Sequence, residues 1–455
     1  MAADSRKLSR KDYADYEFVV RESERLLAMG IEARMEYYRD HREDVLSALW
    51  GKGGGSLECT RQGTQRFAQI VARGLEALGR NALKHSATTL TSALKAKFVD
   101  NALEICAATT EENAHDIFTS VVHEVEQGYK ELTHYIPCSF AAHKEPVSLA
   151  IGPVQFVPRE TFMQENDAAL RDGREAESSS AWRYEELKRF FSVFDWVACV
   201  RVPPCDRSVS EQRSREVTQR ALDLFKLIVG GEGARRVGQG HSLMAPNVLA
   251  NLTSSDTDDF SISWSRQVPG AIVPDGWYRQ VSEFKPWRTA ESIISDHWKN
   301  WANIPEPQQR FLDALSWHGD GLCDPDTQAA TLKFWTAIER VVSFREGDPV
   351  TRRAALLSVS DASQFSTRFK QCQSLYTHRS RILHGNECCK TPKSSGIVIQ
   401  MEELSKKILM FYLSMVAELQ AKGTLTRHAM QDVFTKYEEL SRKAEGPAVE
   451  RVHRR

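Results

Sequence analysis

The stretch Ser374–Asn386, SLYTHRSRILHGN, holds an arginine and a histidine whose types suit chemistry on a phosphodiester. The guanidinium of Arg379 presents a planar fork of donors that matches a phosphate group. The imidazole of His384 can exchange protons near neutral pH, as general acid–base catalysis requires. Gly385 follows directly, and glycine is a common C′ residue, so the sequence predicts that His384 ends a helix.

The spacing of the two residues limits how they can act together. Residues five apart lie ~140° around an ideal helix, so Arg379 and His384 do not share a face of a regular helix. A phosphate can touch both only if the last turn loosens, or if a second subunit completes the site. The local charge is favourable, because Phe365–Lys390 carries a net charge of +4. It holds Arg368, Lys370, Arg379, Arg381 and Lys390 against Glu387 alone.

The bare Arg-x4-His spacing carries little information. It occurs at Arg80–His85, at Arg236–His241 and at Arg379–His384, and composition alone predicts about one match. The first match lies in an amphipathic helical pattern and is expected on a solvated face. The second lies in a glycine-rich loop, where nothing else supports an anion site. Only the third lies in a predicted bundle with a matching inward glutamate.

Two predicted helices place opposite charges on faces that should point inward. In Ala362–His384, alternating spacings of four and three form a stripe of Phe365, Phe369, Cys372, Tyr376, Arg379 and Leu383. In Asp326–Ser343, a similar stripe contains Leu332, Trp335, Glu339 and Val342. An unpaired buried charge is costly and a paired one is tolerated, so Arg379 and Glu339 are expected to meet. From spacing alone, the simpler interpretation is a structural salt bridge.

Composition narrows the class of protein. The 455 residues are 41% hydrophobic and 27% charged with a formal net charge of -1, which is typical of a soluble globular protein with more than one domain. Because the charges cancel, any contact with nucleic acid must be local. The nine cysteines include no CxxC pair, which favours a reduced, cytoplasmic protein. No signal peptide and no run of ~18 apolar residues is present, so no membrane partner is expected.

The chain is predicted to be mixed α and β, mainly α, in four parts. Residues 1–136 form a helical region, in which GKGGGS (Gly51–Ser56) ends a helical pattern from Tyr13 to Trp50 as a flexible connection. Residues 137–285 form a mixed α+β region, a candidate sensor or regulatory domain. Residues 305–445 form a helical bundle, and 446–455 a basic tail. The α+β region should contain strands in Pro146–Pro158, Asp195–Val202 and Asp259–Ser265, a helix in Arg207–Gly230, and extended chain in Val273–Val281.

Two motifs in the bundle resemble a known family. FWTAIERVV (Phe334–Val342), followed by LYTHRSRILHGN (Leu375–Asn386), resembles the HEPN superfamily and most closely its Apea-like branch. In that branch, a helix with the pattern W-x-A-[LI]-E precedes a helix that ends in LYxxRSxIVHG. ALSWHGDGL (Ala314–Leu322) is similar to the first helix of the family. The resemblance extends over about Pro305–Gln420.

The resemblance implies a HEPN-like all-α bundle and a metal-independent endoribonuclease without a cofactor, which acts as a homodimer through that bundle. Carried over by position, Arg379 would hold and polarise the scissile phosphate. His384 would be the acid or base for attack by the ribose 2′-hydroxyl, so that RNA and not DNA is cut. Glu339 would orient Arg379.

The remaining positions of the motif have weaker assignments. Ser380 occupies a position where many active relatives carry Asn, Asp or His. Tyr376 would either stack on a base or pack in the core, and the core is the expected place. Lys370, Arg381 and Asn386 are candidate substrate-binding residues.

Three hypotheses follow from the resemblance. In the first, the chain cuts cellular RNA such as tRNA as a toxin or anti-phage effector, and its N-terminal region answers a phage-derived trigger or a regulatory partner. In the second, the bundle has lost catalysis and serves as an RNA-binding or assembly module. In the third, a partner modifies or masks the RSRILH site of a toxin. Other hydrolases are disfavoured, because GxSxG, HExxH and P-loop motifs do not occur.

Overall fold

The computed structural model describes residues 10–40, 47–50, 56–78, 83–105, 111–142, 148–166, 189, 191–240, 248–254, 260–266, 270–300, 303–385 and 392–445. The chain is mainly helical with a small sheet and a helical C-terminal region, which confirms the predicted fold class. It divides into two compact units. Unit 1 comprises Met1–Thr133 with Arg201–Arg213, and unit 2 comprises His134–Val200 with Ser214–Arg455.

Unit 1 is a group of helices with one β-hairpin. Its helices are α1 (Arg10–Ala28), α2 (Ile31–Asp40), α3 (Arg61–Leu78), α4 (Ala87–Ile105) and α5 (Glu111–Gln127), and its hairpin is β1 (Ser47–Trp50) with β2 (Ser56–Cys59). The prediction of helix up to Trp50 is therefore wrong. Backbone pairing between the two strands outweighs the weak helical pattern of Ser47–Trp50. Residues 51–55 of the glycine-rich segment lie outside the described ranges.

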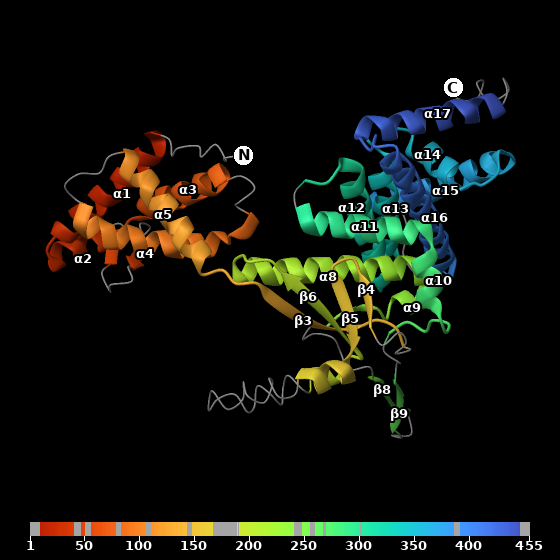
Figure 1. Ribbon diagram of the computed structural model, residues 1–455, viewed down its shortest axis with the longest axis horizontal. Helices are drawn as coiled ribbons and strands as arrows, with labels where there is room; N and C mark the ends of the chain where they lie inside the picture. The colour runs from red at the N-terminus through yellow and green to blue at the C-terminus, as the bar shows by residue number, and fades with distance from the viewer. Residues whose placement is uncertain are drawn as a thin grey trace. The chain divides into compact units, whose positions relative to one another are not determined.

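The sheet of unit 2 has the strand order β4-β5-β6-β3-β7. Its strands are β3 (Leu132–Ser139), β4 (Leu149–Ile151), β5 (Val154–Pro158), β6 (Trp196–Val202) and β7 (Gly238–Gln239), and a separate hairpin joins β8 (Val248–Ser254) to β9 (Phe260–Arg266). The strands predicted from the sequence are all present. Helix α8 (Arg207–Val229), also as predicted, lies along one face of the sheet, as Figure 1 shows. There Phe225 stacks on Phe140 with ring centroids 4.1 Å apart.

The segment Val273–Val281 is not extended, contrary to the prediction. It contains the start of α10 (Trp277–Glu283), which is followed by α11 (Lys285–Asn300).

 Helix α9 (Gly231–Ala234) is a single short turn directly after α8.

Gly276, with φ 68°, reverses the chain before α10, and the buried Trp277 ring lies 5.0 Å from that of Phe225. Packing of this ring on the α8 layer explains why helix replaces the extended chain that the local sequence favours.

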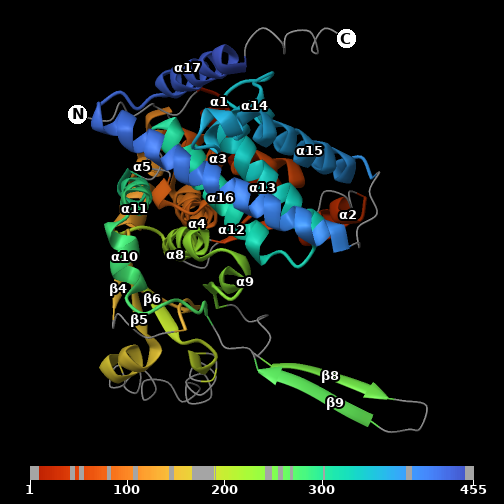
Figure 2. The same cartoon turned by 90° about the vertical axis from the view of Figure 1, so that its right-hand side faces the viewer.

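The C-terminal part of unit 2 is a bundle of helices. It consists of α12 (Glu306–Cys323), α13 (Thr327–Val342), α14 (Val350–Leu357), α15 (Phe365–Leu383), α16 (Pro392–Ala421) and α17 (Arg427–Glu445). Helices α13 and α15 confirm the helices predicted in Asp326–Ser343 and Ala362–His384, whereas the short α14 is missing from the sequence prediction. Helices α12, α13 and α16 lie side by side (Figure 2). Gly321 lets α12 approach α13 closely, because a Cβ there would lie 2.9 Å from the Phe334 ring.

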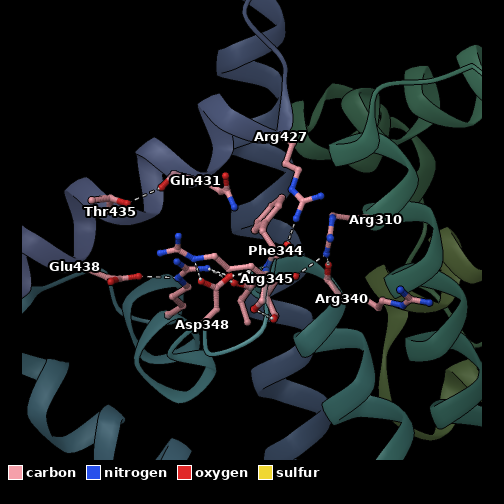
Figure 3. A network of polar contacts seen from close by, with 12 residues as sticks. Arg310, Arg340, Phe344, Arg345, Asp348, Arg427, Gln431, Thr435 and Glu438 are labelled. Atoms are coloured by element: carbon pink, nitrogen blue, oxygen red, sulfur yellow. Dashed lines mark hydrogen bonds and ion pairs between the residues drawn. The ribbon is translucent and has the colours of Figure 1, made fainter.

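A buried ion-pair network holds the connection between α13 and α14 and attaches α17 to it (Figure 3). The Asp348 carboxylate accepts hydrogen bonds from the backbone N–H groups of Phe344 and Arg345 over 2.7 and 3.0 Å. The buried Arg353 guanidinium lies 2.7 Å from Asp348 and 2.7 Å from Glu438 of α17. Burial alone would raise the pKa of Asp348, but these donors hold it below its ordinary value. No helix in the described ranges has the length and hydropathy that a membrane span requires.

Candidate functional site

The predicted meeting of Arg379 and Glu339 is present in the bundle. Arg379 lies near the C-terminal end of α15, and Glu339 lies near the C-terminal end of α13. Arg379 Nη2 donates to Glu339 Oε2 over 3.4 Å, and the two side chains are 23% and 30% exposed. An ion pair this accessible contributes at most about 1 kcal/mol to folding. The guanidinium therefore stays within reach of solvent and of an anionic ligand.

The second oxygen of Glu339 is held by Trp335, one turn earlier on α13. The indole Nε1–H of Trp335 donates to Glu339 Oε1 over 2.8 Å, and the Trp335 side chain is fully buried. Each carboxylate oxygen thus has its own donor, which fixes the plane of the carboxylate toward Arg379. Helical periodicity puts both residues on one stripe but does not by itself assign this contact. Their spacing of four on a helix face is the signal that indicates it.

Tyr376 lies beside this group and does not pack in the core. Its ring centroid is 5.5 Å from that of Trp335 and 6.0 Å from Arg379 Cζ, and the residue is 41% exposed. Leu383, further along the same stripe, is 52% exposed. The expectation that the whole stripe faces the bundle is therefore wrong for Tyr376 and Leu383, whereas Arg379 does meet α13.

The length of α14 explains this difference. Helix α14 has 8 residues and α15 has 19, so at 1.5 Å per residue they span about 12 and 28 Å. A helix this short cannot cover the full length of its neighbour. The N-terminal part of α15 is accordingly the buried part, with Phe365, Cys372 and Leu375 in the core.

His384 ends α15, as the sequence predicts. Its backbone N–H donates to the Ser380 carbonyl over 3.1 Å, and Gly385 follows with φ 67°. The His384 side chain is exposed, and within the described ranges it makes no hydrogen bond or ion pair with Arg379. A single copy of α15 therefore presents the guanidinium and the imidazole as separate groups.

The other candidate residues of the motif lie around Arg379 in different settings. Ser380 is half-buried and contributes its carbonyl to the helix end. Lys370 and Arg381 are exposed on α15. Asn386 lies outside the described residues. From Phe365 to Gly385 the sequence has no acidic residue, so α15 is a cationic helix.

The prediction for the Arg80–His85 match, that it lies on a solvated face, is wrong for His85. His85 is buried in unit 1 and not on a solvated face. Its Nδ1 lies 2.7 Å from the Tyr129 hydroxyl, and its Nε2 lies 3.3 Å from Glu126 Oε1. Burial lowers the pKa of His85. Arg80 and His241, from the first and second matches, lie outside the described residues.

A second group of ionisable side chains lies between α8 and α12, away from Arg379. Lys226 Nζ is 2.9 Å from Asp223 Oδ1, and both side chains are buried. Burial raises the pKa of Asp223 to about 6, although Lys226 and Gln219 oppose the shift. On α12, the fully buried His318 lies 3.0 Å from the Ser405 hydroxyl, and burial lowers its pKa to about 3.

Chemically, the α13–α15 group offers a fixed, accessible guanidinium beside an aromatic ring, with an accessible imidazole at the end of the same helix. These groups can bind a phosphate and exchange a proton at one of its ester oxygens. No protein-family model, no curated protein and no solved structure matches the chain.

Proposed function

We propose that this chain is a metal-independent HEPN-type endoribonuclease. The observation that carries the proposal is the half-exposed Arg379, which Glu339 holds on a cationic helix that ends in the exposed His384. In the proposed reaction, the ribose 2′-oxygen attacks the adjacent phosphorus and the 5′-oxygen leaves. The products are a 2′,3′-cyclic phosphate and a 5′-hydroxyl. DNA lacks the 2′-hydroxyl and is not a substrate.

Arg379 and His384 have separate roles in this reaction. Arg379 neutralises the charge that grows on the non-bridging oxygens of the phosphate. His384 transfers a proton, either from the 2′-hydroxyl or to the leaving oxygen. Because the two residues lie ~140° apart on a regular helix, a second copy of α15 in a homodimer completes the site. The exposed Leu383 supports a partner at this end of the helix.

The biological role that we propose is that of a cytoplasmic toxin or anti-phage effector. It cuts cellular RNA such as tRNA, and the region before the bundle restrains it until a phage-derived trigger or a regulatory partner is present. The support for this role is the resemblance of the two bundle motifs to the Apea-like HEPN branch, whose bacterial members include such effectors.

The test compares the purified full-length chain with Arg379→Ala and His384→Ala, each incubated with total RNA in EDTA. We expect cleavage by the wild type that yields 2′,3′-cyclic phosphate ends, and a loss of at least about a hundredfold in each variant. Matched controls are Arg442→Ala and His428→Ala, which change side chains on α17 that are 67% and 85% exposed. Equal cleavage by all five proteins would exclude Arg379 and His384 as the nuclease site.

A second candidate is a HEPN module that binds RNA without cutting it. The lack of a described contact between Arg379 and His384 within one chain favours it, as does serine at position 380. The same assay separates the two candidates when RNA binding is measured beside cleavage. Binding that Arg379→Ala weakens, without cyclic phosphate ends from any of the proteins, supports this module over the nuclease.

A further inference from the structure

Tyr376 is an aromatic side chain whose position in the sequence predicts burial and whose position in the structure is at the surface. It shares a helical stripe with the buried Phe365 and Cys372, yet it is 41% exposed. A tyrosine at the edge of a core usually turns its hydroxyl to water and hides its ring. Here the exposed residue lies beside the partly exposed Arg379, whose guanidinium is near its ring.

The ring of Tyr376 has a rigid support. Trp335 packs against it in a tilted contact, with ring centroids 5.5 Å apart and an interplanar angle of 46°. Trp335 is fully buried, and its Nε1–H is tied to Glu339. A stacking surface gains affinity when it is held in place before the ligand arrives, because less side-chain entropy is lost on binding.

The charge around the ring indicates the chemistry of its ligand. Arg379 Cζ lies 6.0 Å from the ring centroid, and Lys370 and Arg381 are exposed on the same helix. An aromatic face beside a phosphate-binding cation is the arrangement with which proteins hold unpaired nucleotides, the base on the ring and the phosphate on the cation. An apolar protein partner would not need the cations, and an acidic peptide would not need the ring.

We infer that Tyr376 is a nucleobase-stacking residue, which holds an unpaired base next to the phosphate that Arg379 binds. This inference rests on the proposed function for the identity of the ligand as RNA. It adds that the ligand must offer a base that is free to stack, so paired bases are excluded from this position. Trp335 acts through Tyr376 and Glu339 and is a positioning residue.

The test measures binding and not cleavage. The probe is a fluorescein-labelled, single-stranded oligouridylate of about twelve nucleotides, long enough for a stacking site. Its riboses are 2′-O-methylated, so that the 2′-oxygen cannot attack. A second probe has the same backbone with every base removed. The uniform sequence makes the binding register irrelevant. Fluorescence anisotropy gives the dissociation constant of each probe for the full-length chain and its variants.

We expect the binding affinity to depend on Tyr376 only for the probe that carries bases. Tyr376→Leu should weaken binding of the oligouridylate about tenfold, the scale of one lost stacking contact. The same change should leave binding of the base-free probe within about twofold, and Tyr376→Phe should bind both probes as the wild type does. The matched control is Tyr437→Leu, since Tyr437 of α17 is 37% exposed and packs edge-on against Phe411 at 6.1 Å.

Two outcomes overturn the inference. One is an unchanged affinity of Tyr376→Leu for the oligouridylate, and the other is an equal loss for both probes. The proposed nuclease function fails separately. Base-dependent binding through Tyr376 without cleavage of total RNA leaves the stacking role standing and removes the nuclease. Conversely, if Tyr376→Leu still cleaves RNA and binds the oligouridylate with unchanged affinity, the stacking role fails and the proposed nuclease function stands.

Discussion

At the scale of single residues, the carboxylate of Glu339 is the centre of the candidate site. It accepts from Trp335 with one oxygen and from Arg379 with the other, over 2.8 and 3.4 Å. A carboxylate with one tethered oxygen has little freedom to rotate, so the guanidinium has a preferred place. The longer of the two contacts is the one to Arg379, which leaves that cation available to a phosphate.

The Trp335 contact can be removed without removing the ring. Trp335→Phe deletes the N–H donor and keeps an aromatic side chain against Tyr376. We expect RNA cleavage by the proposed nuclease to fall about tenfold, since a hydrogen bond to a charged group is worth about 1.5–3 kcal/mol. RNA affinity should change little. Cleavage rates and anisotropy on the same preparations check both statements.

Trp196→Phe is the matched control for this change. Trp196 is also fully buried and donates from Nε1, but to the Ala141 carbonyl in the sheet over 2.7 Å. Both variants should lose some thermal stability, and only Trp335→Phe should lose cleavage. A similar loss of cleavage in the two variants would mean that Trp335 matters for folding and not for the site.

At the scale of elements, the contact between α8 and α12 contains buried charge. Gly319 of α12 lies so close to α8 that a Cβ there would sit 2.2 Å from Asp223 Oδ1. Asp223 is paired with Lys226, and His318 is buried nearby on α12. Packing of this kind is sensitive to the protonation of its members, since each buried charge depends on its partner.

Asp223 should give this interface a characteristic pH dependence. Its pKa is raised to about 6, so its contribution to stability is full below about pH 4 and is lost as the pH rises through about 6. Relative to Asp223→Asn, the wild type should therefore lose roughly 3 kcal/mol between pH 4 and 7. Urea denaturation of the full-length chain across this range measures the difference.

The control for this prediction is Asp432→Asn on α17, whose side chain is 56% exposed. His318 acts in the opposite direction, because its lowered pKa makes acid destabilising. Parallel pH profiles for the wild type and Asp223→Asn would contradict the assignment of the pH dependence to Asp223.

At the scale of the whole molecule, the packed bundle begins earlier in the chain than the residues that carry its motifs. Helix α11 belongs to the same unit and packs against α16, although it precedes the residues that resemble the family. Its Trp287, Ile293 and Ile294 are fully buried. A fragment that starts at residue 305 leaves the surface that α11 covers open to water.

We therefore expect a fragment of residues 285–445 to be more stable than one of residues 305–445. Helix α11 packs against α16, and each apolar side chain that it buries there is worth about 1.5–3 kcal/mol. The shorter fragment should melt at a lower temperature or aggregate, as circular dichroism and size-exclusion chromatography would report. Equal melting temperatures would show that α11 is dispensable for the bundle.

The sequence by itself determined the two bundle helices that carry the candidate site, α13 and α15, and the helix end at His384. Hydrophobic periodicity reports which residues share a helix face, and a glycine after a helix reports where it stops. The same periodicity placed Arg379 and Glu339 on facing stripes, and the structure brings them together. The strands around Gly152 followed from their β-branched residues and the Gly-Pro turn.

Only the tertiary structure decided which part of each stripe is covered. Periodicity gives the direction in which Tyr376 points, but the short α14 leaves the residue exposed. Burial of His85 and the helix at Trp277 likewise depend on partners distant in sequence, Glu126 and Phe225. Local patterns record which residues prefer to be buried, whereas exposure depends on how far the neighbouring elements extend. For this protein, that difference separates a core tyrosine from one that is available to a ligand.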